Sequence, residues 1–371
     1  MPRVSVCTPA ELGPAECAQW RAFQRADRHL VSPFLTPEFA TVVGRHRPDT
    51  RVAVLQDGPD IVGFFPYHRN RFGVGRALGY GLANVQGVVH APGLRFDPRE
   101  LLARCGLAVW EFDNLLGHMA AAFAPRRATA EAAPFIDLSI DYETWLSSKR
   151  AASSAVKPAQ RKHRKLHRDV GEVTFEFDAN RSDVVDLLIR WKSQQYRRTG
   201  WADVFARPWV RAVFEELTQL RTATFAGTVS VLSVAGRPAA IQQSLRANGV
   251  LACWFPAYDV ALAPYSPGLA CMFEVVRAAA AHGLAEIDLA KGDADYKRML
   301  KDGDRTVSLG WAERPSPVAL VRRAQQGPQR RLTEFVLARP RLRRAARRTL
   351  RTLGRLRQGP PTAASGVGNR P

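Results

Sequence analysis

The sequence predicts an α/β protein of the α+β kind, in which mixed sheets carry helices on their faces. Two observations lead to this prediction. Three consecutive strands between residues 228 and 256 are joined by Gly236-Arg237 and Asn248-Gly249, and such short turns form antiparallel hairpins. A helix and then a further strand at 285–290 follow, and a strand reached through a helical crossover pairs in parallel. A sheet with both kinds of pairing is mixed.

The first part of the chain, residues 1–130, also alternates strands and helices. The turn Asp57-Gly58-Pro59-Asp60 lies between two apolar strands and favours a hairpin there. The segment 120–134 is rich in alanine and contains Pro125, and we predict that it links two domains. The elements predicted before it are a helix at 15–28 and strands at 51–56, 61–67 and 107–112.

The second part of the chain begins with a short strand and a long polar helix. This helix starts at Asp141, is interrupted near Pro158 and ends at Gly171. At 371 residues the chain exceeds one hydrophobic core, so we expect domains at 1–130 and 135–316 and a basic helical tail at 317–371. The other elements predicted are strands at 134–138, 172–177, 228–235, 238–247, 250–256 and 285–290, a helix at 182–198, and a strand at 305–311 that closes the sheet.

The net charge of +20 is concentrated in two segments, and the rest of the chain is close to neutral. Residues 318–357 interleave leucines with 13 arginines, which predicts an amphipathic helix on an anionic membrane surface. Nucleic acid is the competing partner, although aromatic residues for base stacking are nearly absent there. Residues 359–371 are expected to be disordered. The basic run 161–168 is either a phosphate-binding stripe or a solvated helix face.

The five cysteines show no Cys-x-x-Cys spacing, which favours reduced thiols over disulfides or a structural zinc site. His163 and His167 are four residues apart, but the surrounding cations would repel a metal ion, so we predict no metal site. No charge-free apolar run is long enough to span a bilayer. These features predict a cytoplasmic protein, peripheral on the inner face of the cell membrane through its tail.

The segment 254–297 and the residues before it contain a series of motifs that together carry a family resemblance. These motifs are Tyr258-Asp259, Tyr265-Ser266-Pro267-Gly268-Leu269, Gly283, Ile287-Asp288-Leu289 and Lys291-Gly292-Asp293-Ala294-Asp295-Tyr296-Lys297, with the basic run 161–168, the helix around Trp191 and the hairpin 231–245 upstream. The chain resembles the GNAT-fold acyltransferases of cellulose and polysaccharide biosynthesis (CelD/BcsL-like), which are related to the FemAB aminoacyl transferases, over residues 140–315. The resemblance implies tandem GNAT-like domains with a degenerate N-terminal copy, and an acyl-CoA such as acetyl-CoA as donor. A longer Gly-rich pyrophosphate loop of typical acetyltransferases is absent.

The donor candidates are Ser266, Pro267, Gly268 and Leu269. Proline suits the first position of a helix and glycine lets a ligand approach the backbone, so the free N–H groups of the helix start converge on phosphate. The alternative is an ordinary helix start, in which Ser266 caps the first turn.

The catalytic candidates are Asp288, Tyr296 and Lys297. Asp288 lies in an apolar strand, where lost hydration raises the pKa of a carboxyl, which suits a general base or an acceptor-binding group. Its alternative role is to cap the following loop. The resemblance implies that Tyr296 protonates the leaving thiolate. Lys297 would either neutralise developing charge or bind a phosphate or carboxylate of either substrate. A half-buried core tyrosine and a solvated lysine are the alternatives for these two.

The acceptor-binding candidates are Gln242, Tyr258, Trp191 and Lys291. Gln242 lies on the central hairpin, where one of two adjacent glutamines faces inward, and the two aromatic residues would line a cleft unless they are core. No activated serine or cysteine nucleophile is apparent. We therefore predict direct attack of an amine or hydroxyl of a cell-envelope or polysaccharide-related acceptor on the donor. A FemAB-like transferase using aminoacyl-tRNA, a non-catalytic membrane-recruited scaffold and a nucleic-acid-binding protein are the alternatives.

Overall fold

The computed structural model of the protein describes residues 2–124, 128–179 and 181–324. Its strands form one mixed sheet in the order β1-β2-β3-β4-β6-β13-β7-β12-β11-β10-β9-β8, with β5 paired to β3. The strands are β1 (Arg3–Cys7), β2 (Thr50–Asp57), β3 (Asp60–Arg69), β4 (Val74–Ala77), β5 (Val89–His90), β6 (Val109–Leu116), β7 (Thr129–Asp137), β8 (Val173–Glu176), β9 (Phe225–Val234), β10 (Arg237–Ala247), β11 (Val250–Tyr258), β12 (Glu286–Asp288) and β13 (Gly303–Glu313).

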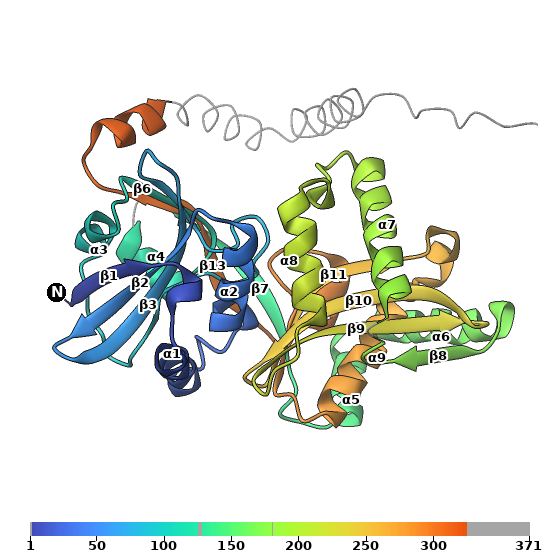
Figure 1. Ribbon diagram of the computed structural model, residues 1–371. Coiled ribbons are helices and arrows are strands. Elements are labelled where there is room, and N and C mark those ends of the chain that lie inside the picture. The colour runs from blue at the N-terminus through green and yellow to red at the C-terminus, as the bar shows by residue number, and fades with distance from the viewer. Residues whose placement is uncertain (1, 125–127, 180, 325–371) are drawn as a thin grey trace, which may run out of the picture.

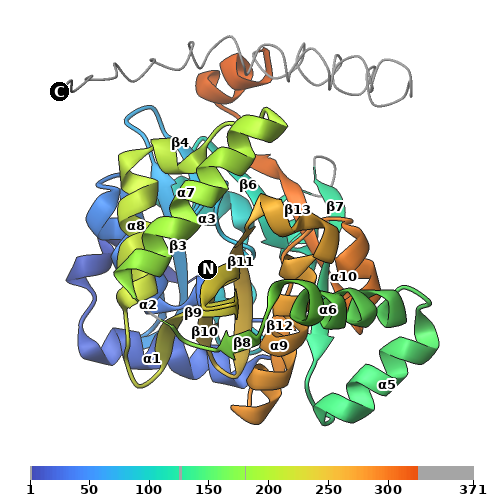
Figure 2. The ribbon, with the colours of Figure 1, turned by 90° about the vertical axis from the view of Figure 1, so that its right-hand side faces the viewer.

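Helices lie on both faces of this sheet. The helices are α1 (Pro14–Ala26), α2 (Pro37–His46), α3 (Pro98–Arg104), α4 (Gly117–Phe123), α5 (Tyr142–Ala152), α6 (Val156–Val170), α7 (Ser182–Thr199), α8 (Pro208–Gln219), α9 (Pro267–Ala281) and α10 (Asp295–Leu300), with 3-10 turns at Pro9–Glu11, Pro33–Leu35, Val204–Ala206 and Val260–Tyr265. In the second half, α7 and α8 cover one face, and α9, α5 and α6 lie on the other (Figures 1 and 2).

The two halves of the chain repeat one succession of elements. The first is β1-α1-α2-β2-β3-β4-α3-β6-α4-β7, and the second is β8-α7-α8-β9-β10-β11-α9-β12-α10-β13. When each element is exchanged for its counterpart, the strand order of the sheet reads the same from its opposite edge. The structure therefore confirms the predicted tandem arrangement. Helices α5 and α6, between the two copies, have no counterpart in the first.

The copies exchange their last strands. Strand β7 of the first copy pairs with β12 of the second, and β13 of the second pairs with β6 of the first. The two exchanged strands also pair with each other at the centre of the sheet, between the halves in Figure 1. The prediction of a linker at 120–134 is therefore wrong in its described parts, which form the end of α4 and most of β7. The strand predicted at 305–311 is part of β13. It does not close the sheet of the second copy, as predicted, but pairs with β6 and β7 of the first copy.

Most of the other predicted elements are confirmed, with small shifts of their ends. The hairpin of β2 and β3 pairs Asp57 with Asp60, and β9, β10 and β11 form the predicted antiparallel meander. The polar helix breaks into α5 and α6, and Gly171 ends α6 with a φ of 138°. The domain boundaries at 1–130, 135–316 and 317–371 stay predictions. Residues 325–371, which hold most of the predicted basic tail, lie outside the described residues.

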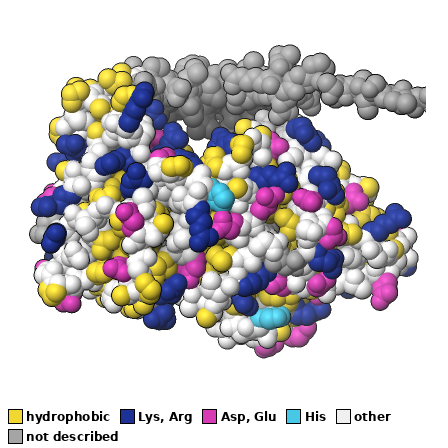
Figure 3. Space-filling view, in the orientation of Figure 1, with side chains coloured by type: hydrophobic (Ala, Val, Ile, Leu, Met, Phe, Trp, Pro, Cys, Tyr) yellow, Lys and Arg dark blue, Asp and Glu magenta, His cyan; other side chains and the backbone are white. Residues whose placement is uncertain are grey.

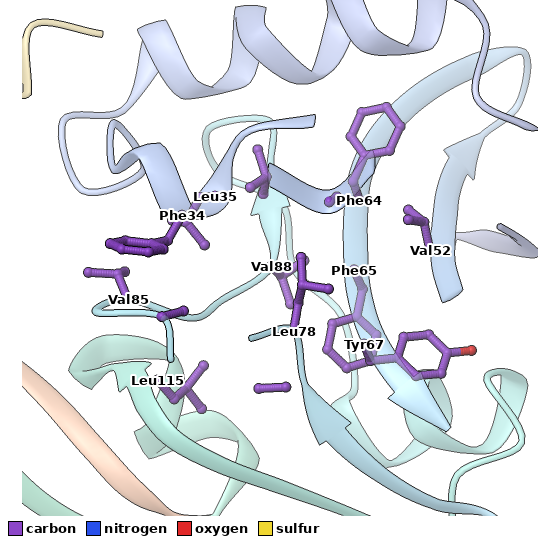
Figure 4. Packing of buried hydrophobic residues seen from close by; sticks show 14 of the residues in the cluster. Phe34, Leu35, Val52, Phe64, Phe65, Tyr67, Leu78, Val85, Val88 and Leu115 are labelled. Carbon is purple, nitrogen blue, oxygen red and sulfur yellow. The ribbon is translucent and has the colours of Figure 1, made fainter. Parts of the chain in front are cut away.

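Apolar packing joins the two copies. The largest cluster fills the first copy with aromatic side chains such as Phe34, Phe64 and Phe65 (Figure 4), and it extends into the second copy through Phe225 and Leu245. Two further clusters lie in the second copy, one containing residues of α9 and the other residues of α7 and α8. On the face shown in Figure 3, basic and acidic side chains lie interspersed over both halves. No described helix is long and apolar enough to cross a bilayer.

Candidate functional site

Strand β11 has an open edge where its partner strand ends. Strand β12 pairs in parallel with only the first three residues of β11, ending with Ala252 opposite Asp288, while β11 continues to Tyr258. The register with β10 shifts at Trp254, which is an extra residue in β11. A bulge of this kind bends a strand and occurs often beside active sites. The two central strands of the second copy thus diverge immediately after Asp288.

Helix α9 begins beside this open edge. Pro267 is its first residue, and Ser266 before it has a left-handed φ of 55° and makes no capping bond with its side chain. The hydroxyl of Ser266 accepts instead from Lys162 Nζ, 3.2 Å away on α6. The first N–H groups of a helix have no acceptor within it, so the start of α9 presents Gly268 N–H beside a lysine. Both features favour an anion.

Gly268 is not required by packing within the protein. A Cβ atom there would meet only the Tyr258 Cδ1 atom, at 3.5 Å, which is an ordinary contact. The backbone around Gly268 and Leu269 is also partly exposed. Tyr258, predicted to bind the acceptor, therefore lies next to the predicted donor turn.

Asp288 is buried and fully engaged. Its side chain is 3% exposed, and burial raises the pKa of its carboxyl. One carboxylate oxygen accepts from Ala290 N at 2.7 Å, and the other accepts from Asn84 Nδ2 at 3.2 Å. The bond to Ala290 is the loop-capping contact that the sequence offered as the alternative to catalysis. Catalysis by Asp288 stays a proposal.

The first copy reaches into this site through a loop at residues 78–88. Asn84 donates to Cys253 O at 3.0 Å as well as to Asp288, and Trp254 Nε1 donates to Leu82 O at 2.8 Å. Both contacts fall on the part of β11 around the bulge. Asn84 could not be identified from the sequence, because it lies in a Gly-rich stretch 204 residues before Asp288.

Lys297 and Tyr296 follow the strand on α10. Lys297 is buried and donates to Ala290 O at 2.9 Å and Lys291 O at 2.8 Å, and burial lowers the pKa of its ammonium group. It thereby holds a loop in which Ala290 adopts a φ of 60°. Tyr296 is partly buried, and burial raises the pKa of its phenol. A cleft of about 330 Å³ adjoins this loop, lined by residues that include Glu131, Gly292, Lys297 and Arg298.

The remaining acceptor candidates are dispersed. Gln242 is buried on β10, and its amide donates to Gln243 O at 2.7 Å. Trp191 packs from α7 against the cluster on the opposite face from α9. Lys291 donates to Asp113 O at 2.6 Å in the first copy and lies 3.6 Å from Glu131. The structure thus brings together Asp288, Tyr296, Lys297 and Lys291, and places Gln242 and Trp191 on other elements.

A basic groove lies between α5 and α6, the two helices without a counterpart. It has a volume of about 540 Å³ and is lined by Arg150, Lys157, Gln160, Arg161 and Arg164. Among the described residues, Lys157, Arg161 and Arg164 form no ion pair. A groove with several unpaired cations can hold phosphate groups. No cluster of three metal-binding side chains occurs among the residues that the structure describes.

Comparisons with known proteins agree with this architecture. Residues 153–298 match the family model of an acetyltransferase (GNAT) domain. No curated protein sequence matches the chain. The C-terminal domain of a putative lysylphosphatidylglycerol synthetase from Agrobacterium fabrum is 12% identical, with a TM-score of 0.51 over 83% of this chain and 95% of that one. The L-PGS structure from Bacillus licheniformis is 10% identical, with a TM-score of 0.50 over 82% and 94%.

The solved structure of FemX is 7% identical, with a TM-score of 0.51 over 83% of this chain and 96% of that one. At these identities the likeness concerns the fold. The chain therefore has the GNAT fold, and its residues 153–298 are similar to the acetyltransferase (GNAT) domain family.

Proposed function

We propose that this protein transfers an acyl group from acyl-CoA, with acetyl-CoA as the simplest donor, to an amine or hydroxyl by direct attack. The observation that carries the proposal is the start of α9 beside the open edge of β11. An uncapped helix start with a lysine beside it suits the pyrophosphate of a nucleotide-linked donor. The divergence of β11 from β12 leaves unpaired backbone along which the extended arm of such a donor can lie.

In this proposal Ser266, Pro267, Gly268 and Leu269 hold the donor phosphates and Lys162 adds a positive charge. The attacking nitrogen or oxygen forms a bond to the acyl carbon, the carbon–sulfur bond breaks, and the proton lost by the acceptor is balanced by one gained by the thiolate. Tyr296 donates that proton, because burial keeps its phenol protonated. Asp288 orients the acceptor, and Lys297 fixes the loop that follows Asp288. On the acceptor side we include Tyr258, beside Gly268, and Lys291, on the loop after Asp288. Gln242 and Trp191 lie on other elements and have no role in this proposal.

We propose a cell-envelope or polysaccharide-related acceptor. This part of the proposal is supported by the resemblance of segment 254–297 to the polysaccharide-biosynthesis type of acyltransferase. The proposed anionic membrane partner is supported by the arginine-rich composition of residues 318–357. The membrane would bring the enzyme to acceptors made at its inner face.

A second candidate is transfer of an aminoacyl group from aminoacyl-tRNA. The observation that favours it is the basic groove between α5 and α6. Lys157, Arg161 and Arg164 lie at helical spacings of four and three residues, so they form one stripe on α6. A stripe of unpaired cations on the helix that also supplies Lys162 is suited to a donor that carries many phosphates.

Calorimetric titration of the full chain with acetyl-CoA tests the donor. We expect one molecule bound per chain, and an affinity reduced about tenfold or more in Gly268→Val, whose side chain would obstruct the N–H groups. Arg99→Val changes the equivalent second position of α3 in the first copy and should leave affinity unchanged. No binding at millimolar acetyl-CoA, together with binding of aminoacyl-tRNA, would replace the first function by the second.

A further inference from the structure

Helix α7 carries a lysine that the sequence did not single out. Lys192 Nζ donates to Pro256 O on β11 at 3.1 Å and to Gln195 Oε1 on its own helix at 3.0 Å. Its ammonium group also lies 5.5 Å from the centre of the Tyr196 ring. The side chain is thus fixed by three neighbours in the space between α7 and β11.

No anion accompanies this lysine. Among the described residues Lys192 has no ion pair, and both of its hydrogen-bond acceptors are neutral. A partly buried ammonium group without a carboxylate is unfavourable and loses its proton more easily. Burial alone lowers the pKa of Lys192 to about 8. A substantial fraction is therefore the neutral amine, which can accept a proton, at pH values near 8.

Lys192 also contacts the strand along which the proposed donor lies. Pro256 is two residues beyond the bulge at Trp254, on the part of β11 that β12 leaves unpaired. The proposed donor would lie along this same edge. Asp288 is 3% exposed, and its two oxygens accept hydrogen bonds from Asn84 and Ala290, so an acceptor molecule has little access to its carboxylate.

We infer that Lys192 is the base that removes the proton from the attacking amine or hydroxyl. This inference rests on the proposed acyl transfer. As the new bond to the acyl carbon forms, the amine of Lys192 takes the proton from the attacking atom and becomes an ammonium ion. The thiolate leaves with the electron pair of the carbon–sulfur bond and takes a proton from Tyr296. Exchange of protons with water then restores both side chains.

The groups around Lys192 do not titrate in the same range. Gln195 and the Pro256 carbonyl carry no charge. Burial, with the nearby Asp203 carboxylate, raises the pKa of Tyr196 to about 12, so its phenol stays protonated. A change in activity near pH 8 that depends on position 192 would therefore report Lys192 itself.

The titration of Lys192 can be measured without any substrate. The full chain is exposed to trace acetic anhydride between pH 6 and 11, and modification of each lysine is quantified by peptide mass spectrometry. We expect a midpoint of about 8 for Lys192 and above 10 for exposed lysines. A midpoint for Lys192 above 10 would overturn the inference.

The second measurement is the pH dependence of kcat/KM for acetyl transfer. Because the base acts in its neutral form, the rate of the wild type should rise with pH and level off above about 8. Lys192→Met should lose this rise and be about 10²- to 10⁴-fold slower, with acetyl-CoA affinity unchanged. Arg198→Met removes one positive charge from the exposed side of the same helix and should retain the wild-type profile.

The outcomes separate the two proposals. A wild type that consumes no acyl donor would contradict the proposed function and, with it, the role of Lys192. An active wild type whose pH profile is unchanged in Lys192→Met would contradict only the inference about Lys192.

Discussion

The two copies differ most at the helix that follows their antiparallel strands. In the second copy this helix, α9, has 15 residues and starts at Pro267 without a side-chain cap. In the first copy it is α3, with seven residues, and the Asp97 carboxylate accepts from Arg99 N at its start. A carboxylate at that position takes the place of a bound anion. Under the proposed function, the start of α9 therefore binds the phosphorylated donor, whereas the start of α3 does not.

The copies also differ at one carboxylate. Glu111 on β6 and Asp288 on β12 occupy the same place in the parallel pairing, opposite Arg76 and Ala252 respectively. Glu111 is bound by Arg76 Nε at 3.1 Å and by Arg322 Nε at 2.7 Å, so its charge is compensated by two arginines. Among the residues that the structure describes, Asp288 accepts only from neutral donors. The carboxylate at this position is thus paired with two cations in the first copy and with neutral groups in the second.

The largest effect should come from these paired carboxylates. Asp288→Asn keeps the size of the side chain but removes its charge, and we expect turnover to fall about 10²-fold or more, with donor affinity nearly unchanged. Glu111→Gln in the first copy should leave turnover within about twofold. Steady-state kinetics and acetyl-CoA titration of both variants check this, and an equal loss in the two would remove the distinction between the copies.

A smaller effect should come from Asn84, a residue of the first copy that donates a hydrogen bond to Asp288 in the second copy. Asn84→Ala removes the bonds to Asp288 and Cys253, and we expect kcat to fall about tenfold while the KM for the donor is retained. Asn114→Ala is the matched control, because Asn114 is also a buried asparagine, bonds to Ala83 O and does not touch Asp288. Each variant should lose about 1–3 kcal/mol of stability. If kcat falls equally in both, Asn84 has no positioning role.

The smallest effect concerns the starts of α3 and α9. Asp97→Ala removes a capping bond, and the free energy of unfolding should fall by about 1 kcal/mol. Ser266→Ala removes no cap and should change stability by only a few tenths of a kcal/mol, but it removes the bond from Lys162 and should weaken acetyl-CoA binding. Urea unfolding measures the stability of both variants, and calorimetry measures their affinity for acetyl-CoA. A larger loss of stability in Ser266→Ala than in Asp97→Ala would contradict the assigned roles.

Local signals in the sequence were sufficient for much of this fold. Turns such as Asp57–Asp60 and Asn248-Gly249 fix hairpins between neighbouring residues, and Ser266-Pro267-Gly268 marks the start of α9. The exchange of β7 and β13 was missed because β7 is rich in alanine and its first four residues are exposed, so that it resembles a linker in composition. Asn84 and Lys192 were not identified from the sequence because the residues that they bond, Asp288 and Pro256, lie far from them along the chain.

The most direct test of the asymmetry between the copies is a crystal structure of the protein with a non-reactive acetyl-CoA analogue. Our account predicts one analogue per chain, with its pyrophosphate at the N–H group of Gly268 and at Lys162, and none at the start of α3. Phosphates bound at the first copy, or at a place remote from α9 in the second, would contradict it.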